Sequence, residues 1–457
     1  MLLHPRARFT RTIYATTPHQ PESIMCFSTK DLKFLVAPTA FATVARTVAL
    51  GIVVPATLVM TVTIVQARPP KKAAIAAATS TGATAATYMP GAVPPPGVNA
   101  RSWILVDPSS NQVLASGNAD EHVEPASLTK LMTAYLVFQA LSTKKISMEQ
   151  IVTPSEVVCS VGTDESRMFI EANKPVSVHD LVYGMIIQSG NDAAIALAEL
   201  VGGSESQFVH MMNAEAQKLG MLGTHFADVN GMPDPQHYTT AGDLAKLSSH
   251  LLRDFPNYYN IFSVKEFSYH NIRQPNRNRL LWIDPTVDGL KTGHTQAAGY
   301  CLIASAKRPL PGTDGGTRRL VSVMMGESKE SARVQDSMKM LNYGYSAFDV
   351  VRSPYKGGQA VETPRVYKGK ANVVQVGVQK DQFITLPKGG GDKVESQVIL
   401  NTPLIAPLTK GQQVGTVEFV ADDKTVAKFP VMALQAVQEA GLLGRILDSI
   451  LLMFSKK

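Results

Sequence analysis

The 457 residues are enough for two or three domains, each with its own core, and the hydrophobic content of 45% is that of a folded protein. The first 72 residues contain nine Lys/Arg and two Asp/Glu, which accounts for the whole net charge of +7. Residues 73–457 therefore contain 35 basic and 35 acidic residues and have no net charge. A neutral body argues against a general nucleic-acid-binding protein, which needs a basic surface.

The cysteines and acidic loops indicate no metal site. Three cysteines, Cys26, Cys159 and Cys301, are too few for a disulfide framework. Whether the last two pair is left open, and buried free thiols are the expected state. Residues 228–231 and 314–316 are expected to be turns, because they lack the carboxylate spacing of a calcium site. No Cys/His cluster has zinc spacing, so we expect neither metal nor cofactor.

The N-terminal part has the features of an export signal. A basic segment precedes an apolar stretch over residues 34–67, whose only charge is Arg46. Residues 47–65 are uncharged and just long enough to cross a bilayer, and small residues lead up to Ala67. The pattern predicts a signal over residues 1–67 that is cleaved after Ala67. An uncleaved signal anchor is the alternative, and either would export the remainder of the chain.

Changes in composition divide the rest of the chain. Residues 68–99 are rich in Ala, Thr, Pro and Gly and have no apolar periodicity, which predicts a linker. Residues 100–354 contain both helix and strand patterns and are expected to form an α+β domain. Residues 355–433 alternate in the manner of strands and predict a small all-β domain, and residues 434–457 predict a helix.

Within the α+β domain, strand patterns flank a helical middle. Strands are predicted at residues 102–107, 112–116, 289–295, 299–307 and 320–326. Helices are predicted at residues 178–201 (with a break at 188–192), 204–219, 240–252 and 331–345. Because strands lie at both ends of the domain, we expect one sheet in which the N-terminal hairpin pairs with the late strands.

The C-terminal helix has one strongly apolar face. Six large side chains fall on a single helical stripe: Leu443, Ile446, Leu447, Ile450, Leu451 and Phe454. Gly441, Gly444, Arg445 and Asp448 interrupt the segment. We therefore expect it to lie in a membrane interface and not to span the bilayer. Packing of the stripe on the β domain is the alternative.

The stretch Pro125-Ala-Ser-Leu-Thr-Lys130 places Ser127 and Lys130 one helical turn apart, and uncharged helix formers follow it. We expect Ser127 in the first turn, where the helix N-terminus favours an oxyanion. A lysine can take the serine proton once its pKa is lowered. Two other Ser/Lys pairs in the chain have the same spacing, so the remainder of the site must decide.

Two further motifs follow in order. Ser189-Gly-Asn191 lies in a predicted helix-to-helix loop, and Lys291-Thr-Gly293 lies on a predicted strand. With the first motif they match the signature of penicillin-binding proteins and class A β-lactamases, except that Gly190 replaces an aspartate. The three motifs together predict an acyl-serine enzyme.

Each catalytic residue type has an expected role. Ser127 would attack a carbonyl, and Lys130 would accept its proton, kept neutral by burial and by repulsion from Lys291. Ser189 would relay a proton to the leaving amine. Asn191 would hold both Lys130 and a substrate amide.

The third motif is expected to bind substrate. An extended peptide can pair with the strand that contains Gly293. The backbone N–H groups of Ser127 and His294 would then form an oxyanion hole. Lys291 and Thr292 would face the terminal carboxylate of the peptide.

Residues 100–457 resemble D-alanyl-D-alanine carboxypeptidases of the penicillin-binding protein 5 type. The matching stretches are Pro125-Ala-Ser-Leu-Thr-Lys-Leu-Met-Thr133, Ile187-Gln-Ser-Gly-Asn-Asp-Ala193, Ile272-Arg-Gln-Pro-Asn-Arg-Asn-Arg-Leu-Leu-Trp282 and Val287-Asp-Gly-Leu-Lys-Thr-Gly-His-Thr295. In that family the residue at Gly190 is commonly glycine. Arg333 stands where the family places an arginine near the substrate carboxylate, although an apparent insertion over residues 309–317 lies upstream.

The resemblance implies a β-lactamase/transpeptidase-like α+β fold, a β-rich C-terminal domain and a terminal membrane anchor. The implied enzyme removes the last D-alanine from peptidoglycan stem peptides, binds β-lactams, and lies on the periplasmic face of the bacterial inner membrane. A β-lactamase is one alternative, but no glutamate lies between Glu215 and Glu266, where class A enzymes carry one. A D,D-endopeptidase and an inactive wall-binding scaffold are the others, and the intact motifs argue against the scaffold.

Overall fold

The computed structural model describes residues 86–310, 316–391, 394–421 and 424–454. The export signal predicted over residues 1–67 lies outside this part of the chain. Residues 86–99, at the end of the predicted linker, pack on the folded domain. Met89 and Val98 are buried in its core, and a short strand at Thr87–Tyr88 joins its sheet.

One six-stranded antiparallel sheet organises the larger domain, in the order β1-β3-β2-β10-β9-β8. Its strands are β1 (Thr87–Tyr88), β2 (Ser102–Asp107), β3 (Gln112–Gly117), β8 (Val287–Thr295), β9 (Gly299–Pro309) and β10 (Thr317–Glu327). The predicted pairing of the N-terminal hairpin with the late strands is confirmed, because β2 lies antiparallel to β10 with Val106 opposite Val321.

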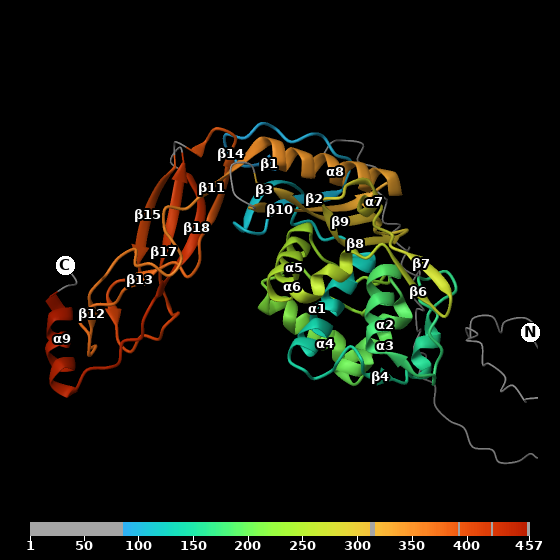
Figure 1. The fold of residues 1–457 in the computed structure, drawn as a ribbon, viewed down its shortest axis with the longest axis horizontal. Coiled ribbons are helices and arrows are strands. Elements are labelled where there is room, and N and C mark those ends of the chain that lie inside the picture. The colour runs from blue at the N-terminus through green and yellow to red at the C-terminus, as the bar shows by residue number, and fades with distance from the viewer. Residues whose placement is uncertain (1–85, 311–315, 392–393, 422–423, 455–457) are drawn as a thin grey trace, which may run out of the picture.

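Helices cover both faces of this sheet. Helix α8 (Glu330–Ala347) lies on one face, and most other helices of this domain form a cluster on the other face (Figure 1). That cluster contains α1 (Lys130–Ser142), α2 (Val178–Tyr183), α3 (Asn191–Gly202), α4 (Glu205–Lys218), α5 (Ala241–Asp254) and α6 (Pro256–Tyr259), with α7 (Leu280–Ile283) near β8. Thr240 caps α5 by accepting a hydrogen bond from the backbone N–H of Asp243, as its position before the apolar pattern predicts.

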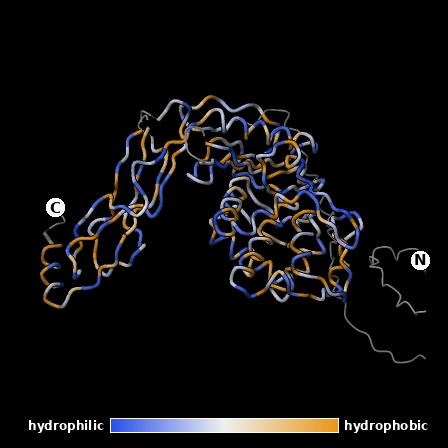
Figure 2. Tube along the Cα trace, in the orientation of Figure 1, coloured by the Kyte–Doolittle hydropathy of each residue, from blue (hydrophilic) through white to orange (hydrophobic). Residues whose placement is uncertain are grey.

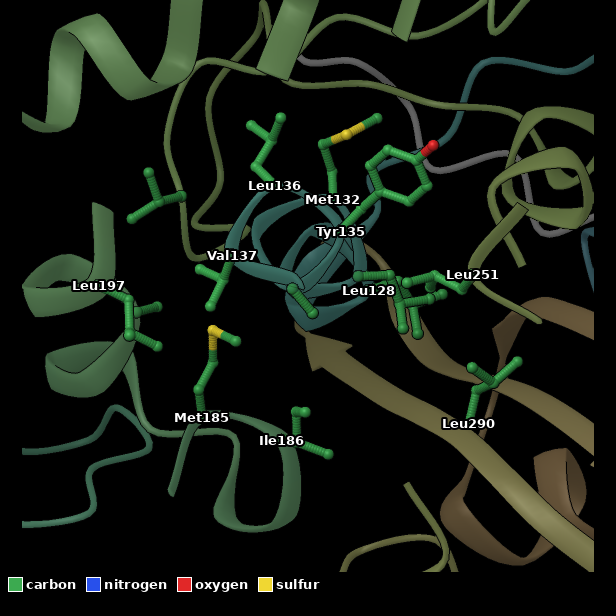
Figure 3. Packing of buried hydrophobic residues seen from close by; sticks show 14 of the residues in the cluster. Leu128, Met132, Tyr135, Leu136, Val137, Met185, Ile186, Leu197, Leu251 and Leu290 are labelled. Carbon is green, nitrogen blue, oxygen red and sulfur yellow. The ribbon is translucent and has the colours of Figure 1, made fainter. Parts of the chain in front are cut away.

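Helix α1 runs through the centre of the helical cluster. It has no charged residue after Lys130, and a helix that is apolar on all sides is stable only when it is surrounded. Figure 3 shows Met132 and Leu136 pointing to one side of α1 and Val137 pointing to another, toward Met185, and all three belong to the buried core. Burial on every side holds the start of α1, and with it the Ser127 turn, in one place.

Two short β ladders were not predicted from the sequence. β4 (Ile151–Val152) pairs with β5 (Val176–Ser177), and β6 (Glu266–Tyr269) pairs with β7 (Ile272–Pro275). The first ladder closes the loop-rich segment between α1 and α2. That segment passes the start of α3, where the second motif lies.

The C-terminal domain is all-β, as expected. Its strands are β11 (Phe348–Arg352), β12 (Val366–Tyr367), β13 (Val376–Gly377), β14 (Phe383–Pro387), β15 (Glu395–Leu400), β16 (Leu404–Ile405), β17 (Gln413–Ala421) and β18 (Lys424–Ala433). Four of them form a sheet in the order β13-β18-β17-β15. The domain has its own apolar core and extends away from the larger domain (Figure 1).

The terminal helix begins later than predicted. Residues 434–440 continue the β domain through backbone hydrogen bonds, such as those between Val437 and Leu408, and α9 spans Leu442–Phe454. Asp448 faces the domain, where it accepts a hydrogen bond from the Lys368 backbone and lies 3.5 Å from Arg365.

The apolar stripe of α9 faces away from the protein. Leu443 is 79% exposed and Leu447 is 63% exposed, which excludes the alternative that the stripe packs on the β domain. Figure 2 shows this hydrophobic helix at the tip of the molecule, at the end farther from the larger domain. Among the described residues, no helix is long and apolar enough to cross a membrane.

Candidate active site

The Ser127 turn lies directly before α1. Ser127 belongs to a 3₁₀ turn, Ala126–Thr129, and Lys130 is the first residue of α1. The prediction placed Ser127 in the first turn of the α-helix itself, so the turn is tighter than expected. Lys130 Nζ lies 3.0 Å from Ser127 Oγ and 2.8 Å from the Asn230 carbonyl oxygen.

The surroundings of Lys130 favour its neutral form. Burial lowers the pKa of Lys130 to about 7, Asp228 acts in the opposite direction, and Arg277 lowers it further. Lys291 was expected to contribute to this lowering, but burial is the main cause and Arg277 is the main cationic contributor. Burial, followed by repulsion from Lys130, also holds the pKa of Lys291 well below its usual value.

Ser189 and Lys291 meet although they are 102 residues apart, and Lys291 Nζ donates to Ser189 Oγ at 2.8 Å. Ser189 has a left-handed backbone (φ 68°) at the break between a π-helical turn, Gly184–Gln188, and α3. Gly190 is confined at this break, because a Cβ there would lie 2.8 Å from Asp192 Oδ1. This crowding explains a glycine where class A β-lactamases have aspartate.

Asn191 forms no hydrogen bond with Lys130, contrary to the prediction. Its Nδ2 donates to Glu165 Oε2 at 2.6 Å, and its buried Oδ1 has no hydrogen-bond partner among the described residues. The second partner of Lys130 is instead the Asn230 carbonyl. The expected role of Asn191 toward a substrate amide stays a prediction.

The third motif runs beside the Ser127 turn. Lys291 and Thr292 are buried on β8, and a Cβ at Gly293 would lie 3.1 Å from the Pro125 carbonyl oxygen. Glycine therefore lets the strand approach the nucleophile closely. His294 is exposed, with its ring centroid 4.0 Å from that of Tyr300. Burial, followed by Arg333, lowers the pKa of His294.

Arg333 reaches the site from α8 and is not a solvated surface residue. It is 5% exposed, it donates to the Gly293 carbonyl oxygen at 3.2 Å, and it lies 3.3 Å from Glu330 Oε1. Its guanidinium carbon is 5.4 Å from the centre of the Tyr300 ring. The position that the resemblance assigned to Arg333 thus brings a cation to the end of the third motif.

These side chains line one cleft of about 760 Å³. Of the residues singled out in the sequence, the cleft is lined by Ser127, Ser189, Asn191, Thr292, Gly293, His294 and Arg333. The two lysines are buried behind the serines with which they hydrogen-bond. The structure thus assembles three motifs that are weak individually into a single site.

Comparisons with known proteins agree with this geometry. Residues 89–329 match the family model described as D-alanyl-D-alanine carboxypeptidase, and residues 351–439 match that of the penicillin-binding protein 5 C-terminal domain. This chain belongs to the D-alanyl-D-alanine carboxypeptidase family. The family assignment and the transpeptidase-like fold predicted from the sequence are confirmed.

Individual relatives cover most of the chain. It is 42% identical to D-alanyl-D-alanine carboxypeptidase DacC of Escherichia coli K12, over 79% of this chain and 89% of the relative. It is 40% identical to DacA of the same strain, over 80% and 90%. The solved structure of penicillin binding protein 5 from Haemophilus influenzae aligns with a TM-score of 0.68 at 40% identity, covering 76% of this chain and 100% of that chain.

Sequence reasoning missed several groups around this carboxypeptidase-family site. Asp164, Glu165, Arg277 and Arg279 line the cleft from loops. Arg277 and Arg279 lie in a stretch that carried the resemblance, but no local pattern distinguishes them from surface arginines. The two acidic residues gave no signal at all.

A second missed group supports Lys130 from behind. The Asp228 carboxylate accepts backbone hydrogen bonds from Asn230 at 2.7 Å and Gly231 at 2.6 Å, so this loop is a turn, as expected. It presents the Asn230 carbonyl to Lys130. The buried His237 ring lies 2.8 Å from Thr129 Oγ1, and burial lowers the pKa of His237.

Cys301 is a buried free thiol, so the question left open about a Cys159–Cys301 disulfide is answered: the two do not pair. Burial raises the pKa of Cys301 to about 11, which keeps it protonated and unreactive at neutral pH. In the part of the chain that the structure describes, no group of three His, Cys, Asp or Glu residues is arranged to hold a metal ion.

Proposed function

We propose that the protein is a serine D,D-carboxypeptidase that releases the terminal D-alanine from peptidoglycan stem peptides through an acyl-enzyme on Ser127. The contact between Lys130 Nζ and Ser127 Oγ, 3.0 Å long and inside the cleft, carries this proposal. Membership of the carboxypeptidase family supports the choice of substrate.

Acylation follows from the residues at hand. Ser127 Oγ attacks the carbonyl carbon between the two D-alanines, and neutral Lys130 takes the hydroxyl proton. Ser189, hydrogen-bonded to Lys291, passes its proton to the departing amine as the peptide bond breaks, and the proton that Lys130 accepted is returned to Ser189, so that Lys130 is neutral again. Water then attacks the ester, Lys130 acts again as the base, and Ser127 is regenerated.

Substrate binding uses the free edge of β8. Among the described strands, β8 is the last in its sheet and pairs only with β9, so an extended peptide can add to its open side. The backbone N–H groups of Ser127 and His294 would stabilise the oxyanion. Thr292 and Arg333, with Lys291 behind them, would bind the terminal carboxylate.

The same site would be acylated by β-lactams, because their strained amide resembles the D-Ala-D-Ala end. Proteins similar to this chain are named penicillin-binding proteins, which supports this second substrate class.

We further propose that an N-terminal signal exports the enzyme and that α9 attaches it to the periplasmic face of the inner membrane. The outward-facing leucines and isoleucines of α9, and the attachment of its polar side to the β domain through Asp448, support an interfacial helix.

The test of the proposed activity is the release of D-alanine from a soluble peptide that ends in D-Ala-D-Ala. The wild-type protein should release D-alanine, and Ser127→Ala should not. Intact mass spectrometry after incubation with penicillin should show one adduct on the wild type and none on Ser127→Ala. A penicillin adduct that persists on Ser127→Ala would exclude Ser127 as the nucleophile.

A further inference from the structure

A buried histidine behind the Ser127 turn has no part in the proposed mechanism. His237 is 2% exposed and does not line the cleft. Its Nε2 lies 2.8 Å from Thr129 Oγ1, and Thr129 is the last residue of the 3₁₀ turn that carries Ser127. A buried imidazole needs a partner for each ring nitrogen, so its contacts indicate what it holds in place.

The second ring nitrogen determines where the proton lies. His237 Nδ1 accepts a hydrogen bond from the Ala227 backbone N–H at 3.3 Å. In a neutral ring the nitrogen that accepts carries no proton, so the proton belongs on Nε2, and Nε2 donates to Thr129 Oγ1. Burial lowers the pKa of His237, which favours this neutral form at neutral pH.

These two hydrogen bonds connect different parts of the chain. The bond to Ala227 stays within one loop, residues 225–238, whose two ends are joined by backbone hydrogen bonds. The bond to Thr129 crosses from this loop to the Ser127 turn. Of the two, only the bond from Nε2 therefore holds the loop and the turn together.

The same loop carries the acceptor that holds Lys130. The Asn230 carbonyl oxygen lies 2.8 Å from Lys130 Nζ. Asp228 folds this part of the loop into a turn by accepting the backbone N–H groups of Asn230 and Gly231. The position of the carbonyl relative to Ser127 therefore depends on how the loop is attached to the Ser127 turn.

Two hydrogen bonds attach the loop on successive helical turns. His237 bonds to Thr129 in the turn itself. Four residues later, Thr133 Oγ1 in α1 donates to the Val229 carbonyl oxygen at 3.0 Å. With only the second of these bonds the loop could tilt against α1, whereas both together fix its orientation. Loss of the His237 bond should therefore let the carbonyl that holds Lys130 move.

We infer that His237 is a positioning residue for Lys130. The neutral ring, protonated at Nε2, attaches the loop of the Asn230 carbonyl to the Ser127 turn and so keeps that carbonyl at hydrogen-bonding distance from the lysine. This inference rests on the proposed function, in which Lys130 is the base. Because His237 lies outside the cleft, its loss should slow acylation without weakening the first binding of the ligand.

Penicillin acylation of the full-length protein in a nonionic detergent separates these two effects. The dependence of the acylation rate on penicillin concentration gives the dissociation constant of the first complex and the rate constant of acylation. In His237→Ala we expect the rate constant to fall about tenfold, as for the loss of one buried hydrogen bond, and the dissociation constant to stay unchanged.

Two amide variants distinguish the ring nitrogens. In His237→Gln the amide nitrogen can take the place of Nε2 and donate to Thr129, so this variant should recover most of the rate. In His237→Asn the shorter amide replaces only Nδ1, so this variant should stay slow. His225→Gln is the matched control, because His225 lies on the same loop outside the cleft, and it should acylate at the wild-type rate.

Thr129→Val tests the same bond from the other side. Valine keeps the shape of threonine but has no hydroxyl to accept from Nε2, so the rate constant should again fall about tenfold. Because both changes remove one bond, the His237→Ala/Thr129→Val double variant should be no slower than either single variant. If a histidine variant does not fold, Thr129→Val alone must show the loss, and a wild-type rate there would overturn the inference.

Other results would also overturn it. These are a changed dissociation constant with an unchanged rate constant in His237→Ala, equal rates in the glutamine and asparagine variants, and losses that multiply to about a hundredfold in the double variant. Absence of a penicillin adduct on the wild-type protein would instead reject the proposed function, and the inference with it.

Discussion

Lys130 is the residue on which the proposed chemistry depends most directly. A lysine in water has a pKa near 10.4 and is a poor base at neutral pH. The apolar core around α1 buries Lys130, and its Nζ forms hydrogen bonds with Ser127 Oγ and the Asn230 carbonyl oxygen. Burial therefore changes a common surface cation into a base.

Replacing Lys130 by arginine keeps a positive charge but removes the base. A guanidinium does not lose its proton in proteins, so Lys130→Arg should acylate with penicillin at least about 100-fold more slowly than the wild type. The rate of adduct formation, followed by mass spectrometry, measures this. A near-normal rate would show that another group accepts the proton.

The pH dependence of acylation should follow the same residue. Because burial lowers the pKa of Lys130 to about 7, the lysine is protonated and inactive below that pH and neutral above it. The acylation rate constant should therefore rise through about pH 7 and level off by about pH 8 to 9. A rate that is unchanged between pH 6 and pH 9 would contradict a lysine base with this pKa.

At the scale of elements, three segments far apart in the chain meet at the Ser127 turn. The turn is contacted by β8 at Gly293 and by the Asp228 loop at Gly231. Gly231 has φ +91°, and a Cβ there would lie 1.7 Å from the Ala126 carbonyl oxygen. The approach of these elements depends on residues without side chains.

Gly231→Ala should therefore displace the Ser127 turn and abolish penicillin acylation while the rest of the domain folds. Gly220→Ala is the matched control, because Gly220 also has a positive φ (+72°) but nothing lies within 4 Å of its missing Cβ. That variant should lose only about 1 kcal/mol of unfolding free energy and acylate normally. Equal acylation by the two variants would show that the close approach at Gly231 is unimportant.

At the scale of the whole molecule, the β domain separates the cleft from α9 (Figure 1). Buried polar contacts join the two domains: Asp107 accepts a hydrogen bond from Thr385 Oγ1 at 2.7 Å, and Gln112 exchanges hydrogen bonds with the Thr385 backbone. Because Thr385 belongs to β14, these contacts fix the base of the β domain to the sheet that carries the active site.

Removing α9 should release the enzyme from membranes without reducing its activity on a soluble peptide. The chain should stop after Ala440, because residues 434–440 still form backbone hydrogen bonds with the β domain. Its first residue should be about residue 86, behind a cleavable signal, so that no N-terminal anchor remains. Sedimentation with membranes and D-alanine release measure the two effects.

The apolar stripe determines how strongly this truncation should weaken membrane binding. Each large side chain buried in the membrane interface contributes roughly 1.5 to 3 kcal/mol, so several leucines and isoleucines suffice for reversible attachment. Truncated protein that still sediments with membranes, or that loses soluble activity, would mean that α9 is not the anchor.

The sequence by itself determined the long helices, the main strands of the larger sheet and the three motifs. The run of uncharged helix formers after Lys130 predicts a helix, strand patterns at both ends of the domain predict the shared sheet, and the order of the Ser-Lys, Ser-Asn and Lys-Thr-Gly motifs predicts the family. These features are recognised from local periodicity and composition, which depend on residues that are close together in the chain. The late start of α9 was missed because residues 434–440 have no strand alternation of their own.

Tertiary structure alone decided which groups surround those motifs. The Asn230 carbonyl lies 100 residues from Lys130 and the Glu165 carboxylate 26 residues from Asn191, and both belong to loops without periodicity. A carboxylate in a loop is usually solvated. Its local sequence does not indicate whether the folded chain will point the side chain toward a cleft. The residue types were therefore sufficient to predict the proton chemistry. The hydrogen-bond partners of Asn191 and the main cause of the low Lys130 pKa depend on burial, which arises only when the chain is folded.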